Sequence, residues 1–333
     1  MLLAGDIGGT KTVLAVFSAE QGPNTPLVQK TYPSACYPTL EAMVEEFLAT
    51  VNLTVESACF GVAGPVFAGR AQITNLPWVI DTACLQAAFG WHSVHLINDL
   101  EAVAYAIPIL KPADIEVLSA GQAVPGGNLS VVAPGTGLGE AYLTVENGRY
   151  VAHASEGSHA SFAPQNALEL GLLRYLWEVK GFEHVSFERV CSGALGIPNL
   201  YAYLKDTGYA EEPTWLAEAL ANSDDPTPVI LSTAMDEAHP STLCRGVLDL
   251  FTSILGSEAG NQALKVMATG GIYLGGGISP RILSRLKEPA FLDAVRSKGR
   301  FQTLLTHIPV NVILNSQAGL LGAAAFGLDR QAA

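Results

Sequence analysis

Hydrophobic residues in the first third of the chain alternate between short unbroken runs and helical spacing. Apolar residues recur every three or four positions over 40–51, and an unbroken run follows at 58–62. Another run at 94–97 precedes a second helical segment, which ends at Pro108. Unbroken runs of this length are typical of buried strands, and spacing of three or four residues is typical of helices that cover a sheet. The pattern therefore predicts an α/β fold.

The pattern changes after a stretch rich in proline, glycine and polar residues, marked by Pro108, Pro112 and the segment 121–128. Beyond this stretch helical spacing predominates. Helices are predicted at 165–180, 197–205, 214–221, 241–266 and 318–326, and strands at 272–274 and 310–314. We predict a small α/β domain over 1–109, completed by about 303–328 near the C-terminus, and a large α/β domain over 110–302.

Two glycine-rich turns, each between two apolar runs, are the most informative motifs. They read Gly5-Asp6-Ile7-Gly8-Gly9-Thr10 and Gly135-Thr136-Gly137-Leu138-Gly139. Glycine lets backbone N–H groups approach a ligand closely and adopts a positive φ without strain, so such turns can cradle phosphate oxygens. Neither turn has the spacing of a P-loop or of a dinucleotide-binding fingerprint. The alternative is a pair of ordinary hairpin turns.

A third glycine turn, Gly275-Gly276-Gly277, follows the predicted strand at 272–274. We expect a helix to begin near Pro280, so this turn would lie at a helix start. Because glycine has no side chain, the turn can admit the flat face of an adenine or a ribose. A plain loop explains the same residues equally well.

Composition and charge narrow the class of partner. The 333 residues are 49% hydrophobic and 15% charged, which describes a compact protein. The net charge of −13 argues against nucleic acid or an anionic membrane as the main partner, because both require a basic surface. A phosphate ligand is compatible with this charge, since backbone N–H groups, magnesium and Lys11 can supply local positive potential.

The compartment is indicated by cysteine spacing and by the N-terminal residues. The five cysteines are widely separated and show no zinc-binding spacing, so we interpret them as thiols in a reducing compartment. No apolar run is long enough to span a bilayer, and the chain enters a strand without a basic, hydrophobic leader. We therefore expect a cytoplasmic protein without a membrane partner.

A second group of residues is polar and suits a polyhydroxylated ligand: Asn98, Asp99, Glu156, His159 and Glu188. A carboxylate can accept from two adjacent hydroxyls, and an amide both donates and accepts, which is what sugar binding requires. Asp99 could also accept a proton from an attacking hydroxyl during phosphoryl transfer. The alternatives are a helix cap for Asp99, a solvated first-turn carboxylate for Glu188 and a structural role for His159.

Several motifs, in order and spacing, resemble those of the bacterial glucokinases over nearly the whole chain. They are the two glycine turns, Ile97-Asn98-Asp99, Glu156-Gly157-Ser158-His159, His184-Val185-Ser186-Phe187-Glu188-Arg189-Val190 and Gly275-Gly276-Gly277-Ile278. The resemblance implies an α/β, two-lobed actin-like (ribonuclease H-like) ATPase fold with a central cleft. It also implies a homodimer that uses glucose and magnesium-ATP.

The resemblance assigns roles to individual residues. Asp99 is expected to be the general base, and Asn98, Glu156, His159 and Glu188 are expected to bind the sugar hydroxyls. The residues expected to bind ATP are Gly5, Asp6, Ile7, Gly8, Gly9, Thr10, Gly135, Thr136, Gly137, Gly275 and Gly276. No direct metal ligand is assigned; magnesium would be carried by ATP near Asp6.

Two features distinguish this chain within that resemblance. The family's sugar-binding turn usually reads Glu-Gly-Gly-His, whereas Ser158 stands in place of the second glycine. The related repressor and sugar kinase family carries a cysteine-rich zinc motif, which this sequence lacks. We therefore predict an ATP-dependent hexose kinase that makes glucose 6-phosphate. The alternatives are a kinase for another hexose or with another phosphoryl donor, and a non-catalytic sugar or nucleotide sensor on the same fold.

Overall fold

The computed structural model describes residues 1–73 and 75–331. Contacts divide the chain into two compact units: unit 1 contains residues 1–114, 141–154 and 315–333, and unit 2 contains residues 115–140 and 155–314. Residues close to the C-terminus thus belong to the same unit as the N-terminal strands. The predicted domain limits stay a prediction, because units defined by contact density need not coincide with domains.

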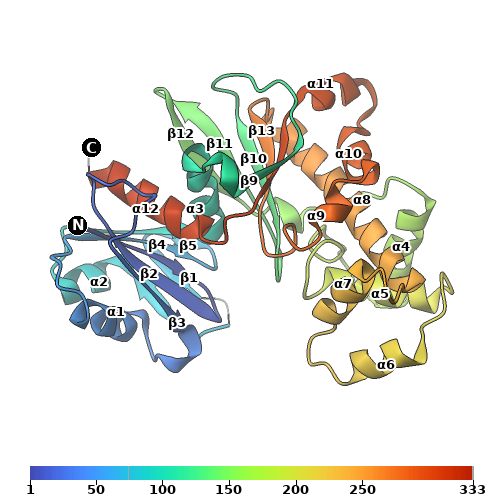
Figure 1. Ribbon diagram of the computed structural model, residues 1–333, viewed down its shortest axis with the longest axis horizontal. Helices are drawn as coiled ribbons and strands as arrows, with labels where there is room; N and C mark the ends of the chain where they lie inside the picture. The colour runs from blue at the N-terminus through green and yellow to red at the C-terminus, as the bar shows by residue number, and fades with distance from the viewer. Residues whose placement is uncertain (74, 332–333) are drawn as a thin grey trace. The chain divides into compact units, whose positions relative to one another are not determined.

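Unit 1 is built on a five-stranded sheet with the order β3-β2-β1-β4-β8 (Figure 1). Its strands are β1 (Leu2–Ile7), β2 (Lys11–Phe17), β3 (Val28–Pro33), β4 (Ser57–Val62) and β8 (Ser93–Asn98). Strand β1 pairs antiparallel with β2 and parallel with β4, which in turn pairs parallel with β8. The two apolar runs beside the first glycine turn form strands β1 and β2, and the strands predicted at 58–62 and 94–97 are confirmed.

Helices cover both faces of this sheet because successive strand residues point to opposite sides. Leu3, Leu14 and Phe60 pack on the side of α1 (Leu40–Ala49) and α2 (Thr82–Phe89). Leu2, Ala15 and Cys59 pack on the side of α3 (Asp99–Ala106) and α12 (Ala318–Gln331). Figure 1 shows the two helix pairs on opposite sides of the sheet. The result is a three-layer arrangement that fixes the carboxyl ends of β1, β4 and β8.

The remaining strands form two further sheets. A six-stranded sheet has the order β12-β11-β10-β13-β14-β9, and a small sheet has the order β5-β6-β7. The bounds are β5 (Val66–Phe67), β6 (Arg70–Gln72), β7 (Val79–Asp81), β9 (Ile115–Ser119), β10 (Leu129–Pro134), β11 (Leu138–Glu146), β12 (Arg149–Ser155), β13 (Gly271–Leu274) and β14 (Val310–Ile313). The strands predicted at 272–274 and 310–314 are confirmed, and the apolar runs on either side of the second glycine turn form β10 and β11.

Unit 2 is mainly helical, and its core surrounds one long helix. Its helices are α4 (Ala167–Glu178), α5 (Gly196–Asp206), α6 (Thr214–Ala221), α7 (Pro226–Met235), α8 (Thr242–Val266), α9 (Leu283–Leu286), α10 (Pro289–Arg296) and α11 (Gln302–His307). Helix α8 is buried along most of its 25 residues, as expected of a helix packed on several sides. One prediction is wrong: the residues around Pro280 form turns, and the next helix begins only at Leu283.

Candidate active site

The first glycine turn joins β1 to β2 and is fixed by its neighbours. The N–H of Gly8 donates to the Lys11 carbonyl at 3.1 Å, and the Ser34 hydroxyl donates to the Gly8 carbonyl at 2.7 Å. A Cβ on Gly8 would lie 2.9 Å from the Lys11 carbonyl oxygen. Gly8 is not one of the described residues that have a positive φ. Close approach of backbone atoms, rather than left-handed geometry, is therefore what requires glycine here.

The second glycine turn is held from both sides. The Gly135 N–H donates to the Gly137 carbonyl at 2.8 Å, and the Gly135 carbonyl accepts from the Gly193 N–H at 2.8 Å. The Thr136 carbonyl accepts from the Ala194 N–H at 2.9 Å. A Cβ on Gly135 would meet no heavy atom within 4 Å. The turn therefore has a fixed backbone with open space above Gly135.

The third glycine turn lies directly beside the second. Gly275 N–H donates to the Val132 carbonyl at 2.9 Å, and Ile278 N–H donates to the Pro134 carbonyl at 3.1 Å. Gly276 has a φ of 73°, and a Cβ there would collide with the Pro134 carbonyl. The structure thus brings together Gly275, Gly276 and the turn that begins at Gly135, two motifs that are far apart in the sequence.

Asp6 lies at the end of β1 beside the start of α12. A Cβ on Gly319, in the first turn of that helix, would lie 3.3 Å from the Asp6 carboxyl carbon. Burial raises the pKa of Asp6 above its usual value, and the charge of Lys11 opposes this rise. A carboxylate that has lost much of its hydration gains strongly from a nearby cation, so this position suits a metal-bound phosphate.

Asn98 and Asp99 are fixed by the transition from β8 to α3. Asn98 is the N-cap of α3: its Oδ1 accepts from Leu100 N–H at 2.9 Å, and Glu101 completes a capping box. Its Nδ2 donates to the Gly64 carbonyl at 3.1 Å. The alternative that Asp99 caps this helix is wrong, because Asn98 occupies the cap and Asp99 is the first helical residue.

The Asp99 carboxyl group is half-buried at this helix start. Its Oδ1 accepts from Leu100 N–H at 3.0 Å. Burial raises the pKa of Asp99 to about 6, and the charge of Asp6 adds to this rise. A carboxylate with a pKa close to neutral can take up a proton more readily than an ordinary aspartate while remaining ionised at pH 7.

Glu156, His159 and Glu188 lie together in unit 2. The His159 Nε2 lies 3.7 Å from a Glu156 oxygen, and its Nδ1 lies 3.7 Å from a Glu188 oxygen. Glu156 and His159 are 73% and 58% exposed, whereas Glu188 is 24% exposed. The Glu188 N–H donates to the Ser158 carbonyl at 3.0 Å, which ties the turn to the segment that carries Glu188. These separations exceed hydrogen-bond length and leave the carboxylate oxygens available to hydroxyl groups.

Ser158 fits the sugar turn without strain. Its side chain is buried, and it is not among the described residues with a positive φ. It lies in a short 3₁₀ turn, Gly157–His159, that begins after Glu156. A serine can therefore occupy this backbone geometry.

The structure also joins the nucleotide and sugar motifs within unit 2. A Cβ on Gly137 would lie 2.7 Å from Glu188 Oε1. Sequence reasoning did not foresee this contact. It likewise missed Gly64 and Glu101, which fix Asn98, although Asn98-x-x-Glu101 is itself a capping-box signature.

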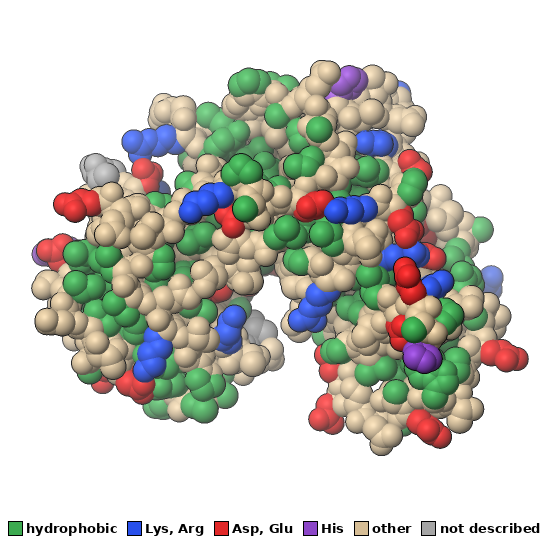
Figure 2. All heavy atoms as spheres, in the orientation of Figure 1, with side chains coloured by type: hydrophobic (Ala, Val, Ile, Leu, Met, Phe, Trp, Pro, Cys, Tyr) green, Lys and Arg blue, Asp and Glu red, His purple; other side chains and the backbone are tan. Residues whose placement is uncertain are grey.

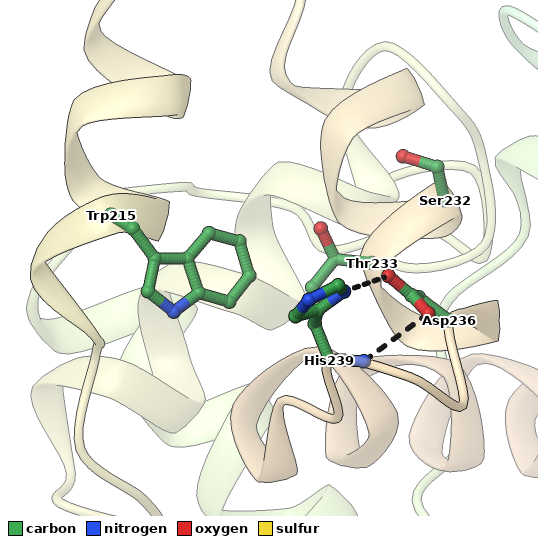
Figure 3. A pocket seen from close by; sticks show the side chains of 5 residues that line it. All are labelled: Trp215, Ser232, Thr233, Asp236 and His239. Atoms are coloured by element: carbon green, nitrogen blue, oxygen red, sulfur yellow. Dashed lines mark hydrogen bonds and ion pairs between the residues drawn. The ribbon is translucent and has the colours of Figure 1, made fainter.

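A separate surface cavity of about 350 Å³ lies among the helices of unit 2 (Figure 3). It is lined by Trp215, Ser232, Thr233, Asp236 and His239. Asp236 Oδ1 accepts from the His239 N–H at 3.2 Å, and the His239 ring lies against the other carboxylate oxygen. None of the predicted site residues lines this cavity.

Surface charge and membrane features complete the description. On the face drawn in Figure 2, lysine and arginine side chains stand singly among acidic and hydrophobic ones. Within residues 1–73 and 75–331, no helix combines the length and the apolar character that membrane crossing requires.

Comparisons with known proteins agree over almost the full length of the chain. A family model described as Glucokinase matches residues 3–330. A glucokinase of Nostoc punctiforme is 41% identical over 337 residues, covering 97% of this chain and 98% of the relative. The crystal structure of a glucokinase from an Antarctic psychrotroph is 34% identical, with a TM-score of 0.82 and 98% coverage of both chains. A glucokinase from Balamuthia mandrillaris, solved in complex with glucose, shares the fold at 22% identity and a TM-score of 0.78, covering 99% of this chain and 93% of that one.

Fold and site motifs together define an ATP-dependent hexose kinase with the actin-like ATPase fold. The chain belongs to the glucokinase family. The predictions of fold class, family and enzyme class are confirmed.

Proposed function

We propose that the chain transfers the γ-phosphoryl group of ATP to the 6-hydroxyl of D-glucose, with Asp99 as general base. Membership in the glucokinase family supports glucose and ATP as the substrates. The observation that carries the residue assignment is the environment of Asp99: a carboxyl fixed at a helix start, with a pKa of about 6. Catalysis of phosphoryl transfer depends mainly on positioning and electrostatic stabilisation, to which such a base contributes.

Glucose would be bound by the carboxylate, imidazole and amide side chains of the sugar motifs. Glu156, His159 and Glu188 offer carboxylate and imidazole acceptors to adjacent hydroxyls. Asn98 would contribute chiefly as a donor, because its Oδ1 already accepts from the α3 backbone and one Nδ2 hydrogen is used by Gly64. This division of roles leaves the 6-hydroxyl to Asp99.

ATP would be bound by the glycine turns. The open space above Gly135 lets a phosphate approach the backbone, and the neighbouring Gly275 and Gly276 suit the adenosine part. In unit 1, the turn from Gly5 to Thr10 offers backbone groups beside Lys11, whose ammonium group supplies local positive charge.

Magnesium fits the carboxyl group of Asp6. Mg²⁺ commonly binds to proteins through one or two carboxylates together with substrate phosphates and water. Asp6 is half-buried and its pKa is raised, whereas no cluster of three or more metal-ligating side chains occurs in the described residues. Bound there, the ion would neutralise phosphate charge. The residues of this chain would orient it through Asp6 and leave proton transfer to Asp99.

We also propose a homodimer located in the cytoplasm. The family resemblance supports the dimer. The five cysteines are unpaired in the structure, which supports a reducing compartment, and ATP is abundant there. Sedimentation of the purified protein over a wide range of concentrations would test the dimer.

A coupled assay with a panel of sugars and phosphoryl donors tests the function. We expect glucose with ATP to give the highest kcat/KM, and mannose, fructose and galactose to be poorer substrates. A higher kcat/KM for another hexose, or for a donor such as polyphosphate, would contradict the substrate assignment. Glucose binding without turnover under every donor would favour a sensor instead.

A further inference from the structure

Glu140 is a buried acid for which the proposed reaction has no use. It follows Leu138 and Gly139 in β11, directly after the second glycine turn, and is 1% exposed. Neither of its carboxylate oxygens has a hydrogen-bond partner among the described residues. Buried polar groups are nearly always paired, because an unpaired one loses hydration without compensation.

The carboxyl group of Glu140 packs against the sugar turn. A Cβ on Gly157 would collide with Glu140 Oε2 and lie 3.2 Å from the carboxyl carbon. Gly157 follows Glu156 and begins the short turn that ends at His159. Only a glycine at position 157 leaves room for the Glu140 carboxyl group, which therefore packs directly against the backbone of the turn.

A second buried acid, Glu258 of helix α8, lies close enough to Glu140 for its charge to act on it. Glu258 is fully buried, and its two oxygens accept from Asn261 Nδ2 at 2.9 Å and from Lys265 Nζ at 3.2 Å. These three residues share one face of the helix, at spacings of three and four. Both oxygens of Glu258 already accept hydrogen bonds, one of them from an ammonium group, whereas the oxygens of Glu140 have no partner among the described residues.

Two lysines lie near the pair, and neither donates a hydrogen bond to Glu140 among the described residues. Lys265 faces Glu258 from α8, and Lys298 lies close enough to feel the charge of Glu258 while donating to Ser257 at 3.0 Å. Cys191 is buried near both acids, and its burial, together with their charges, raises the pKa of its thiol. Two ionised carboxylates cannot donate to one another, so a single proton on Glu140 supplies the missing hydrogen bond.

The titratable groups of the turn itself lie on its other side. Glu156 and His159 are both exposed, so water screens their charges from the buried pair. The protonation of Glu140 is therefore governed by its burial and by Glu258 rather than by the sugar-binding side chains.

We propose that protonated Glu140, hydrogen-bonded to Glu258, is a positioning residue that holds the turn from Glu156 to His159 in its sugar-binding geometry. The inference rests on the proposed function, in which Glu156, His159 and Glu188 bind glucose. Loss of the proton would set two buried carboxylates against one another and drive Glu140 away from Gly157. The sugar turn would then lose its support.

This role makes glucose affinity sensitive to alkaline pH. Burial, followed by the charge of Glu258, raises the pKa of Glu140 to about 8, while Lys265 opposes the rise. If only the protonated form supports the turn, the fraction of competent protein falls from about nine-tenths at pH 7 to about one-tenth at pH 9. The apparent glucose affinity should then weaken by about tenfold.

The experiment compares glucose affinity, by calorimetry without nucleotide, and the KM for glucose at pH 7, 8 and 9. Four forms are measured: the wild type, Glu140→Gln, Glu258→Gln and the exposed-carboxyl control Glu211→Gln. The amide introduced by Glu140→Gln keeps a donor toward Glu258 but cannot ionise. The affinity of this variant at pH 7 should therefore be near that of the wild type and should stay constant to pH 9. Glu258→Gln removes the opposing carboxylate, and its amide can donate to an ionised Glu140, so the affinity of this variant should change less between pH 7 and pH 9 than that of the wild type.

The outcomes separate this proposal from the proposed function. The control should follow the wild type at every pH. A wild-type affinity that is constant from pH 7 to 9, or a Glu140→Gln variant that weakens as the wild type does, would overturn the positioning role. If Glu140→Gln does not fold, the pH dependence of Glu258→Gln decides the question, and a loss of affinity between pH 7 and pH 9 as large as that of the wild type overturns the proposal. Wild-type protein that binds no glucose even at pH 7 would refute the proposed function, and the positioning role with it.

Discussion

Asp99 in unit 1 and Glu188 in unit 2 are both carboxylates with a proposed role in glucose phosphorylation, yet their surroundings differ sharply. Asp99 is the first residue of α3, next to a capping box, and its pKa is raised to about 6. The Glu188 side chain is 24% exposed, and one of its carboxylate oxygens lies 3.7 Å from a ring nitrogen of His159. A group that exchanges a proton must have both its position and its pKa controlled. A group that only accepts hydrogen bonds must have free oxygens.

The largest expected effect follows from removing the base. Asp99→Asn keeps the size of the side chain and its ability to hydrogen-bond, but the amide cannot accept the proton. We expect kcat to fall by about two to four powers of ten with glucose affinity nearly unchanged. Steady-state kinetics and calorimetry on the folded variant would measure both. A kcat near that of the wild type would mean that Asp99 does not act as the base, so its role would not differ from that of Glu188.

The next effect concerns the sugar-binding carboxylates. Replacing a charged acceptor by Gln weakens hydrogen bonds to the sugar, and we expect the KM for glucose to rise by about ten- to a hundredfold in Glu188→Gln. Glu156→Gln should have a smaller effect, because Glu156 is 73% exposed and Glu188 only 24%. The ATP KM serves as the internal control. An equal rise in the KM for glucose in both variants would mean that burial does not determine which of the two carboxylates contributes more to binding.

The pH dependence of kcat/KM tests the environment of Asp99. The base must be ionised, so kcat/KM should fall as pH drops through about 6 and be about tenfold below its plateau at pH 5. The residual rate of Asp99→Asn should lack this step. An acid limb that persists in Asp99→Asn would assign it to another group.

The raised pKa of Asp99 also affects the free energy of unfolding. A carboxyl group with a raised pKa stabilises the fold most when it is protonated, so its contribution declines as pH rises from about 4 to about 6.

The smallest effect comes from two matched glycine substitutions. Gly135→Ala adds a methyl group in open space where phosphate is expected, so it should raise the KM for ATP several-fold and leave the KM for glucose unchanged. Gly137→Ala places its methyl group against Glu188 and should therefore raise both constants. Melting temperatures of both variants control for folding. Identical effects of the two substitutions on both KM values would mean that the contact between Gly137 and Glu188 does not affect glucose binding.

Regular elements with strong periodicity were predictable from the sequence. Helix α6 has the predicted bounds, and the ends of α4, α5 and α8 differ from prediction by at most two residues. Elements with weak or masked patterns were missed. Helix α7 contains two prolines in its first turn, and β3 is an exposed, mostly polar strand. Such segments form because their neighbours provide partners, which local pattern does not encode.

The candidate site divides in the same way. Motif residues such as Asn98, Asp99 and the glycine turns can be identified from the residues next to them in the sequence. The approach of Glu188 to Gly137, and of Glu140 to Gly157, depends on segments brought together only by folding. One signal was nevertheless present: Glu140 is an ionisable residue inside a strand that is otherwise largely apolar, between Leu138 and Ala141. A charge in such a context indicates either an edge or a specific buried partner.

The packing of α12 on the sheet of unit 1 bears on how the protein is made. Leu320, Ala323 and Ala324 complete the core against strands that are translated first, and Gly319 lies beside Asp6. Strands β1 and β2 therefore leave the ribosome some three hundred residues before the helix that covers them. Until α12 has been made, the turn from Gly5 to Thr10 lacks the helix that packs beside Asp6. A chain truncated before Ala318 would leave this side of the sheet without its covering helix.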